Sequence, residues 1–600
     1  MTNSFDSMVF LVRKVGAGLA LRLLTAATAL AVLDTVGVAV VFPYLTFISA
    51  APSPSGTSDV VSRIKEVLGI TSQIEFVILI SVFLMGFFVI KFFLSYFCNW
   101  IRFRTSAAIT TKLSDQLIHY LLNADYGHLS SVSVAEATGI INGETIHVVI
   151  CLDAWVTIAT EALFLLLILC AVIAINPQLA MALVGMLGVV SLVLYFGILK
   201  TVAELGARQA AIHLRQYRFL HSIVSAIKDM KILGLEGAVE SEHQLLNSRY
   251  AKAVASFNLY QTLPRSVVEL FIMLALLGAC ALVLRAEVDI AAILPLVGFL
   301  AVSSLRVIPS YSRLISSYSS FNYYQPSLAL IKDLFESLSG RQVSVSIRPL
   351  TFRKDIEIRN LKFSHAEKLV LADVSLVIPK GSSVGIVGLS GSGKTTFLDV
   401  LAGLRRADQG EFLMDGVPFD PFQSDSLRRL LGYVPQNVTL VDDTVAFNIA
   451  FEETGDVEGL RRAAQIARIE RVIDALPNGF TTLVGEGGVR LSGGQRQRIG
   501  IARALYKSPE ILIFDEATSA LDNLTERELT NEIAALAGDK TIIVVAHRLS
   551  SIMRCDVIYL FDEGRIAGHG THAELLATSP AYRLLYHGSG EATHRETAAL

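Results

Sequence analysis

A glycine-rich segment in the second half of the chain contains the residue types that bind phosphate. Residues 388–396 read GLSGSGKTT, which fits the pattern G-x-x-x-x-G-K-[ST], and the apolar run 383–387 before them predicts the strand that this pattern requires. Glycines let backbone N–H groups curl around phosphate oxygens, the lysine reaches the β- and γ-phosphates, and the threonine hydroxyl ligates Mg²⁺. The predicted phosphate-binding residues are Gly388, Ser390, Gly391, Ser392, Gly393, Lys394, Thr395 and Thr396.

A second motif supplies acidic groups. Residues 511–514 are apolar and predict a buried strand, which is followed by Asp515 and Glu516. Asp515 is expected to hold Mg²⁺ together with Thr395, and Glu516 to polarise the attacking water. On its own, an apolar run that ends in two acids indicates only a strand that meets solvent. Together with the phosphate loop, it predicts nucleotide hydrolysis.

The remaining motifs of this half resemble those of the ABC ATPase family. The segment LSGGQ occupies residues 491–495, Gln436 precedes it, and SALD at 519–522 and His547 follow it. The resemblance covers residues 355–585 with all motifs in order. It implies an α/β P-loop ABC ATPase domain whose nucleotide is ATP and whose metal is Mg²⁺.

The resemblance also implies a role for each motif residue. Gln436 would sense Mg²⁺ and the attacking water, as a metal-site and catalytic residue; His547 would hold the γ-phosphate, and Asp522 would couple the two ATP sites. The signature residues that would contact the γ-phosphate bound to the other subunit are Ser492, Gly493, Gly494 and Gln495. Because one chain has one phosphate loop and one signature, the resemblance implies a homodimer with two equivalent sites.

One position departs from the family pattern. The first strand of the domain usually has a tyrosine two residues after a phenylalanine, as the platform for adenine, whereas this chain has Phe363 followed by His365. An imidazole can still stack on adenine, with less area. His365 is therefore the predicted adenine contact.

The first half of the chain has the composition of a membrane domain. Only 43 of the first 340 residues are charged, against 62 of the last 260. Six apolar runs are each near the ~20 residues that cross a bilayer as a helix; they are 23–48, 76–100, 151–175, 178–199, 266–284 and 290–308. The sequence predicts an all-α six-helix transmembrane domain over 1–340, the ATPase domain over 341–587 and a polar tail over 588–600.

Net charge and cysteine usage exclude other classes of protein. The net charge of −3 argues against nucleic acid as a partner, which usually requires a basic surface. The five cysteines lie far apart without a Cys-x-x-Cys pair, so neither a disulfide framework nor a zinc site is indicated.

The basic residues predict the orientation in the membrane. The connection 200–265 has nine lysines and arginines, whereas the three connections assigned to the outside have three in total. This asymmetry predicts a cytoplasmic N-terminus and a cytoplasmic ATPase domain. The resemblance to bacterial flippases described below implies a bacterial inner membrane. The outer segment 58–70 has apolar residues on one side of a helix, which fits an amphipathic helix on the membrane surface or a loop helix packed on the spans.

Six spans followed by an ABC ATPase resemble the ABC exporters, in which binding of ATP closes the ATPase dimer and hydrolysis reopens it. The resemblance implies coupling helices near 125–130 and 223–234. Three stretches are similar to PglK-type flippases of lipid-linked oligosaccharides: the outer segment with 58–70, residues 226–236, and 263–265 with Glu269.

Charges near the spans suggest a binding site for cargo. Arg306 and Arg313 are seven residues apart and so share one helix face, about 10.5 Å apart. With Arg265, they could bind the pyrophosphate of a lipid-linked saccharide. The alternative is that Arg306 snorkels to the membrane interface. Asp34 and Lys91 lie inside spans and are expected to form an ion pair.

Three functions remain open from the sequence. The first is an ATP-driven flippase of a lipid-linked oligosaccharide or related glycolipid, and the second is a general exporter of lipids, amphiphiles or drugs. The third, of another class, is an ATP-gated channel or regulator. The complete set of hydrolytic motifs disfavours the third.

Overall fold

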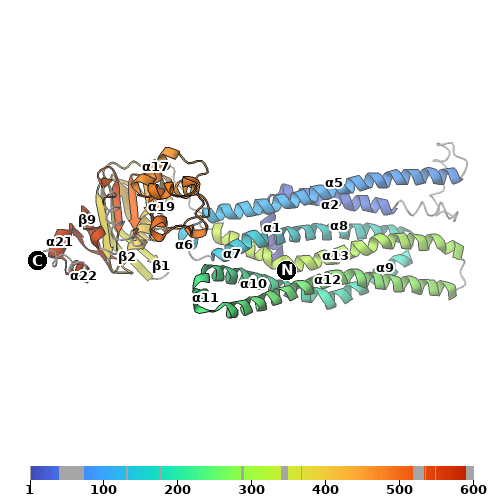
Figure 1. Ribbon diagram of the computed structural model, residues 1–600. Helices are drawn as coiled ribbons and strands as arrows, with labels where there is room; N and C mark the ends of the chain where they lie inside the picture. Colours follow the sequence, from blue (N-terminus) through green and yellow to red (C-terminus); the bar gives the residue numbers. More distant parts are fainter. Residues whose placement is uncertain are drawn as a thin grey trace. The chain divides into compact units, whose positions relative to one another are not determined.

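The computed structural model describes residues 2–39, 73–129, 133–175, 177–285, 290–339, 349–365, 368–517, 531, 533, 535–546 and 549–588. These residues belong to two compact units (Figure 1). The first comprises Met1–Ala124 and Ser130–Arg341, and the second comprises Asp125–Leu129 and Gln342–Leu600. The predicted helix over 58–70 lies outside the described residues, as do Asp522 and His547.

The described residues of the first unit form helices and the short connections between them. Its elements are α1 (Thr2–Val15), α2 (Ala17–Ala39), α5 (Gln73–Leu122), α7 (Val134–Gly139), the π-helical turn η1 (Ile140–Glu144), α8 (Thr145–Ile175), α9 (Pro177–Leu194), the π-helical turn η2 (Tyr195–Leu199), α10 (Lys200–Ser225), α11 (Ile227–Leu233), α12 (Glu236–Arg285) and α13 (Ile290–Ser339). Helices α5, α12 and α13 have 50 residues each, or about 75 Å at 1.5 Å per residue. They are therefore much longer than a bilayer core is thick.

Four helical stretches of the described residues are long and apolar enough to cross a membrane. They are Ala17–Gly37, Ile74–Leu122, Val134–Cys170 and Val184–Ser225. They correspond to the first four predicted spans, although the first predicted span extends beyond the described part of α2. The fifth and sixth predicted spans fall in α12 and α13 and stay predictions.

The long helices of the first unit lie side by side (Figure 1). Helix α8 packs on α13, α2 packs on α5, and α10 contacts both α12 and α13. Phe257 of α12 stacks on Tyr323 of α13 with ring centroids 3.7 Å apart. Gly206 of α10 lies so close to α13 that a Cβ atom there would be 2.1 Å from the carbonyl oxygen of Tyr323. The close approach of α10 and α13 therefore requires glycine.

The second unit contains short helices and two sheets. Its helices and helical turns are α6 (Tyr126–Leu129), α14 (Lys394–Leu401), η3 (Pro421–Gln423), α15 (Asp425–Leu430), α16 (Val445–Ala450), α17 (Val457–Ile466), α18 (Glu470–Asp474), η4 (Gly479–Thr481), η5 (Glu486–Gly488), α19 (Gly493–Tyr506), η6 (Leu549–Ser551), α21 (His572–Thr578) and α22 (Pro580–Gly588). Its strands are β1 (Asp355–His365), β2 (Lys368–Pro379), β3 (Ser383–Gly388), β4 (Gln409–Met414), β5 (Val417–Phe419), β6 (Leu431–Val434), β7 (Ile511–Asp515), β8 (Thr541–Val545), β9 (Val557–Asp562) and β10 (Arg565–Gly570).

The larger sheet positions the predicted chemistry. Its strand order is β10-β9-β3-β8-β7-β6, with all neighbours parallel except β10, which is antiparallel to β9. The smaller sheet is antiparallel with the order β2-β1-β4-β5. Because parallel strands end at one edge of a sheet, Gly388 at the end of β3 and Asp515 at the end of β7 lie at the same edge, with only β8 between them. Ligands of open α/β sheets bind at this edge.

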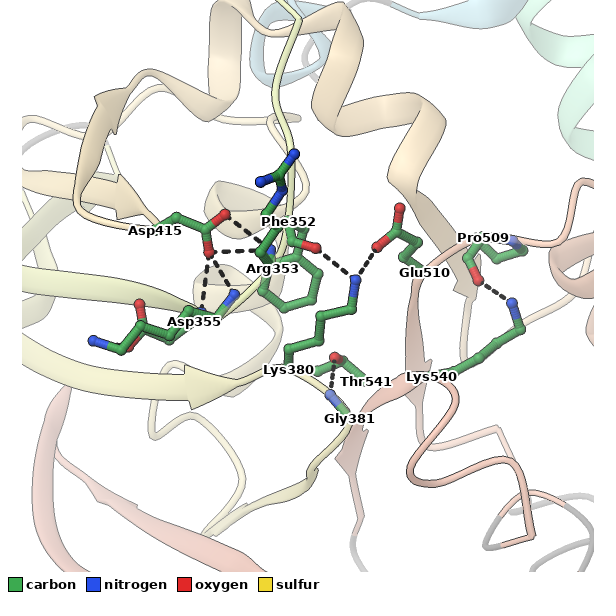
Figure 2. Close-up of polar contacts among 11 residues, drawn as sticks. Phe352, Arg353, Asp355, Lys380, Gly381, Asp415, Pro509, Glu510, Lys540 and Thr541 are labelled. Carbon is green, nitrogen blue, oxygen red and sulfur yellow. Dashed lines mark hydrogen bonds and ion pairs between the residues drawn. The ribbon is translucent and has the colours of Figure 1, made fainter.

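A polar network fixes the chain where it enters β1 (Figure 2). The carboxylate of Asp415 accepts hydrogen bonds from the backbone N–H groups of Arg353, Lys354 and Asp355. Partial burial alone would raise the pKa of Asp415, but these three hydrogen bonds together lower it. The network therefore holds the Asp415 carboxylate in its charged form.

The same network reaches the strand that carries the acidic motif. Lys380 directly follows β2. Its ammonium group donates to the carbonyl oxygen of Phe352 at 2.6 Å and to the Glu510 carboxylate at 2.7 Å (Figure 2). Glu510 directly precedes β7, so this lysine ties the start of that strand to the smaller sheet. The other end of β7 carries Asp515.

Candidate functional site

The phosphate loop connects β3 to α14, as its sequence predicts. Gly388 ends β3, where a Cβ atom would be 2.1 Å from the carbonyl oxygen of Phe561. Gly393 has a φ of +98°, and a Cβ atom there would be 2.9 Å from the side chain of Leu371. A side chain at either position would displace backbone or core atoms. Only glycine at these two positions lets the loop turn this tightly at the sheet edge.

Lys394 points back into this loop. Its ammonium group donates to the carbonyl oxygens of Gly388 and Leu389, both at 2.9 Å, and only 5% of the residue is exposed. Burial lowers the pKa of Lys394, while the negative charges of Asp515 and Glu516 act in the opposite direction. The lysine thus places a positive charge inside the loop, within the electrostatic influence of both acids.

The two acidic residues lie in different environments. Asp515 is 4% exposed, and the Tyr433 hydroxyl at the neighbouring strand β6 donates to its Oδ2 atom at 3.2 Å. Burial raises the pKa of Asp515, and the hydrogen bond from Tyr433 partly offsets this effect. Glu516 has a φ of +51°, unusual for a residue other than glycine, and its backbone N–H donates to the carbonyl oxygen of Val545. Such a conformation costs free energy and is concentrated at functional sites.

Gln436 lies directly against the second acid. Its Nε2 atom donates to Oε2 of Glu516 at 2.5 Å. The structure therefore brings together the two residues for which the sequence predicts contact with the attacking water. They come from positions 80 residues apart in the chain.

The donor set at the sheet edge fits Mg²⁺. The Oδ1 atom of Asp515 is buried and has no hydrogen-bond partner among the described residues, which leaves an acceptor for a ligand. The exposed Thr395 is the second residue of α14, directly after Lys394, and Gln436, two residues after the end of β6, adds an amide group. A carboxylate, a hydroxyl and an amide oxygen are the hard ligands that Mg²⁺ prefers.

The signature segment caps the helix α19. The Ser492 Oγ atom accepts the backbone N–H of Gln495, and the Gln495 side chain accepts the backbone N–H of Ser492. In this capping box, each of the two side chains accepts a backbone N–H group of the same chain at the start of α19. The backbone of Gly493 and Gly494 then forms the first turn of a 14-residue helix, whose N-terminus favours anions. Gln495 thus has a structural role that the sequence prediction missed.

His365 ends β1 and is exposed. We expect His365→Ala to raise the ATP concentration for half-maximal hydrolysis about 5- to 10-fold, because the small imidazole ring should contribute near the lower end of the about 1–3 kcal/mol that stacking of a base on a ring is worth. The maximal rate should stay unchanged. Hydrolysis rates measured over a range of ATP concentrations test the prediction, and an unchanged half-maximal concentration would reject His365 as the adenine contact.

The first unit contains a partly open polar cavity of about 610 Å³. Its lining comes from five helices, α2, α5, α8, α12 and α13, and is rich in hydroxyl, amide and charged groups. The polar lining residues are Asp34, Ser95, Asn99, Arg102, Asp153, Thr157, Thr160, Glu161, Gln261, Arg313, Ser316, Ser317 and Ser320. Polar groups inside otherwise apolar helices indicate a functional site.

The three arginines predicted to bind cargo have different positions. Arg313 lines the cavity and bonds Glu161. Arg265 does not line the described cavity; it pairs with Glu269 one helical turn away, and its side chain is 74% exposed. The Arg306 side chain lies outside the described residues. The structure therefore does not bring Arg265 together with Arg313 in this cavity.

The expected ion pair between Asp34 and Lys91 is confirmed, with 3.1 Å between the carboxylate and the ammonium group. The sequence did not indicate that Asp153 and Glu161 would pair with cavity arginines. The only sign of a function in the sequence was that both residues are acids within otherwise apolar helices.

Comparison with known protein sequences identifies a matching family and similar proteins. Residues 371–519 match the family described as ABC transporter. An ATP-dependent lipid A-core flippase of Aromatoleum aromaticum is 47% identical over 238 residues, which are 38% of this chain and 39% of that protein. The chain thus spans about two fifths of the length of this relative. The ATP-dependent lipid A-core flippase of Pseudomonas fluorescens is 31% identical over 517 residues, 82% of either chain.

A solved structure has the same fold. The structure of a bacterial Atm1-family ABC exporter with ATP bound matches 94% of this chain and 97% of its own, with a TM-score of 0.76 and 23% sequence identity. The chain has a helical transmembrane domain fused to an α/β ABC ATPase domain, as the sequence predicts. It belongs to the ABC exporters.

Proposed function

We propose that this exporter is an ATP-driven flippase, which moves a glycolipid with a polar headgroup across a bacterial inner membrane. The observation that carries the proposal is the polar cavity inside the apolar helices of a chain that also has a phosphate loop with the acidic pair at the same sheet edge. A polar headgroup crossing a bilayer needs such a polar environment, because an unpaired polar group in hydrocarbon costs several kcal/mol. The names of the relatives, which describe flipping of a lipid A-core, support the same substrate class.

In the proposed ATP site, each residue near the sheet edge has one task. The phosphate loop and Lys394 bind the phosphates, and Thr395, Gln436 and Asp515 hold Mg²⁺, which would neutralise charge that develops on the phosphates. Glu516, oriented by Gln436, accepts the proton of the attacking water. The contact between their side chains supports this assignment. As the family resemblance implies, His547 would hold the γ-phosphate and Asp522 would couple the two ATP sites.

We propose that the protein acts as a homodimer. The chain has one phosphate loop and one signature helix, and a complete site in this family takes them from two subunits. The first turn of α19, with Ser492, Gly493 and Gly494 at its start, would then contact the γ-phosphate held by the loop of the other subunit. Binding of ATP would close the dimer and hydrolysis would reopen it.

Within the glycolipids, we propose a headgroup that combines sugar with phosphate. Hydroxyl and amide groups of the cavity suit sugar hydroxyls, and Arg313 suits a phosphate oxygen. A lipid-linked oligosaccharide, with its pyrophosphate, and a lipid A-core both have this chemistry. The three stretches that resemble PglK-type flippases favour the former, and the names of the relatives favour the latter.

Reconstitution tests the function. The full-length protein is placed in liposomes with a fluorescent lipid-linked saccharide, a lipid A or a phospholipid in both leaflets, and ATP-dependent transfer is followed by the accessibility of the label. We expect transfer of the sugar- and phosphate-bearing lipids only. Equal transfer of phospholipids or free amphiphiles would favour the general exporter, and ion conductance without lipid transfer would favour the channel.

A further inference from the structure

The two arginines of the cavity differ in how their guanidinium groups are used. The Arg102 Nε and Nη2 atoms donate to the two oxygens of Asp153 at 2.5 and 2.6 Å, and Nη2 also donates to the Thr157 hydroxyl. The side chain of Arg102 is only 19% exposed. A bidentate pair of this kind is among the strongest hydrogen-bonded contacts in proteins, so two of the three guanidinium nitrogens of Arg102 are already committed to Asp153 and Thr157.

Arg313 is held at one atom only. Its Nε atom donates to Oε1 of Glu161 at 2.5 Å, and the other oxygen of Glu161 accepts the hydroxyl of Ser310. The Glu161 side chain is 14% exposed, whereas that of Arg313 is 41% exposed. Within the described part of the cavity, the two terminal nitrogens of Arg313 have no acceptor. Because Arg313 lines the cavity, these nitrogens are the donors that remain for a ligand there.

The surroundings of these donors suit a polyhydroxyl ligand. Ser316, Ser317 and Ser320 line the cavity on the same helix as Arg313. Gln261 of α12 also lines it and donates to the Ser320 hydroxyl at 2.6 Å. A ligand that has both an anionic group and hydroxyl groups would match the guanidinium and its neighbours together.

We propose that Glu161 is a positioning residue that also sets the affinity of this site for an anion. Its contact with Nε fixes the guanidinium so that the terminal nitrogens face the cavity. At the same time, its negative charge repels the phosphate that these nitrogens bind, which keeps binding weak enough for release. The inference rests on the proposed function, since it assigns the phosphate of the flipped lipid to Arg313, and it assigns Arg102 a structural role.

The test separates the charge of Glu161 from its hydrogen bond. Glu161→Gln keeps an oxygen for Arg313 Nε but loses the charge, whereas Glu161→Ala loses both. The matched control is Glu242→Gln, which makes the same change in the Arg215–Glu242 pair, outside the described cavity lining. Two probe lipids are compared: a polyprenyl diphosphate-linked disaccharide and a diglucosyl diacylglycerol, which has sugars without phosphate.

Binding of each probe to the detergent-solubilised, full-length protein is measured by native mass spectrometry, and stimulation of ATP hydrolysis is measured in liposomes. With Glu161→Gln, we expect half-saturating concentrations of the diphosphate lipid to fall about 5- to 10-fold, because a like charge near the phosphate is removed. With Glu161→Ala, these half-saturating concentrations should rise, because the contact that fixes the Arg313 guanidinium is lost. The maximal rates should stay unchanged. The half-saturating concentration should not shift for the uncharged glycolipid or in the control variant.

The outcomes distinguish this inference from the proposed function. An equal shift for both lipids, no shift with Glu161→Gln, or no binding of the diphosphate lipid to the unmodified protein would overturn the role of Glu161. Phosphate-selective binding that responds to Glu161→Gln, without ATP-dependent flipping, would support the role of Glu161 and reject the flippase.

Discussion

Replacement of Glu516 by Gln should reduce ATP hydrolysis about 10²- to 10⁴-fold while ATP binding persists. The amide has nearly the shape of the carboxylate but cannot accept a proton from water. It can still bond the side chain of Gln436, so the geometry at the end of β7 is expected to survive. Without hydrolysis, the dimer should accumulate in the closed, ATP-bound form.

Two measurements check this prediction. Phosphate release gives the rate of hydrolysis, and retention of radiolabelled ATP after gel filtration detects the trapped dimer. Glu510→Gln is a matched control, because it makes the same change at the opposite end of the same strand, where the carboxylate bonds Lys380. That variant should keep its hydrolysis rate. Hydrolysis above about a tenth of the original rate in Glu516→Gln would reject Glu516 as the base.

The phosphate site could be predicted from the sequence because its parts are local. The turn of the phosphate loop needs glycines at fixed positions, and the strand before it is a continuous apolar run. The acidic pair directly follows a second such run. In a parallel sheet, both patterns end at the same edge whatever lies between them, so the spacing of residues 388 and 515 did not need to be known.

The cavity could not be predicted in the same way. Its ion pairs join residues far apart in the chain, such as Arg102 with Asp153 and Arg313 with Glu161, and helix periodicity does not say which helices become neighbours. The sequence marked Arg313 as a charge near a span. It did not indicate the carboxylate that holds it, and it grouped Arg265 with it although that residue pairs along its own helix.

Side-chain hydrogen bonds in the ATPase domain show the same limit. Gln495 belongs to the signature motif, whose predicted contact with nucleotide stays a prediction, and its side chain completes a capping box with Ser492 that the motif did not indicate. Tyr433 belongs to no motif, and its hydrogen bond to Asp515 follows only from the pairing of β6 with β7 in the structure. A motif identifies which residues gather at a site, whereas hydrogen-bond geometry decides what each of them does.

Replacement of Lys394 by Met should weaken ATP binding about 10- to 100-fold and reduce hydrolysis at least as much. A hydrogen bond to a charged group contributes about 1.5–3 kcal/mol, and the ammonium group is the positive charge inside the loop. In the described structure this group bonds the carbonyl oxygens of Gly388 and Leu389, and bound phosphates would compete for it. Methionine fills a similar volume and removes a buried charge, so the domain should remain folded.

Lys394→Met and Glu516→Gln should have opposite effects on the closed dimer. Both lose hydrolysis, but Lys394→Met should fail to retain ATP and should leave no closed dimer, whereas Glu516→Gln accumulates it. Equilibrium binding of a fluorescent ATP analogue measures the first difference and gel filtration with ATP measures the second. Lys507→Met, at an exposed ion pair with Glu452, is the control and should bind ATP normally. If Lys394→Met retains ATP as well as Glu516→Gln does, the lysine does not hold the phosphates.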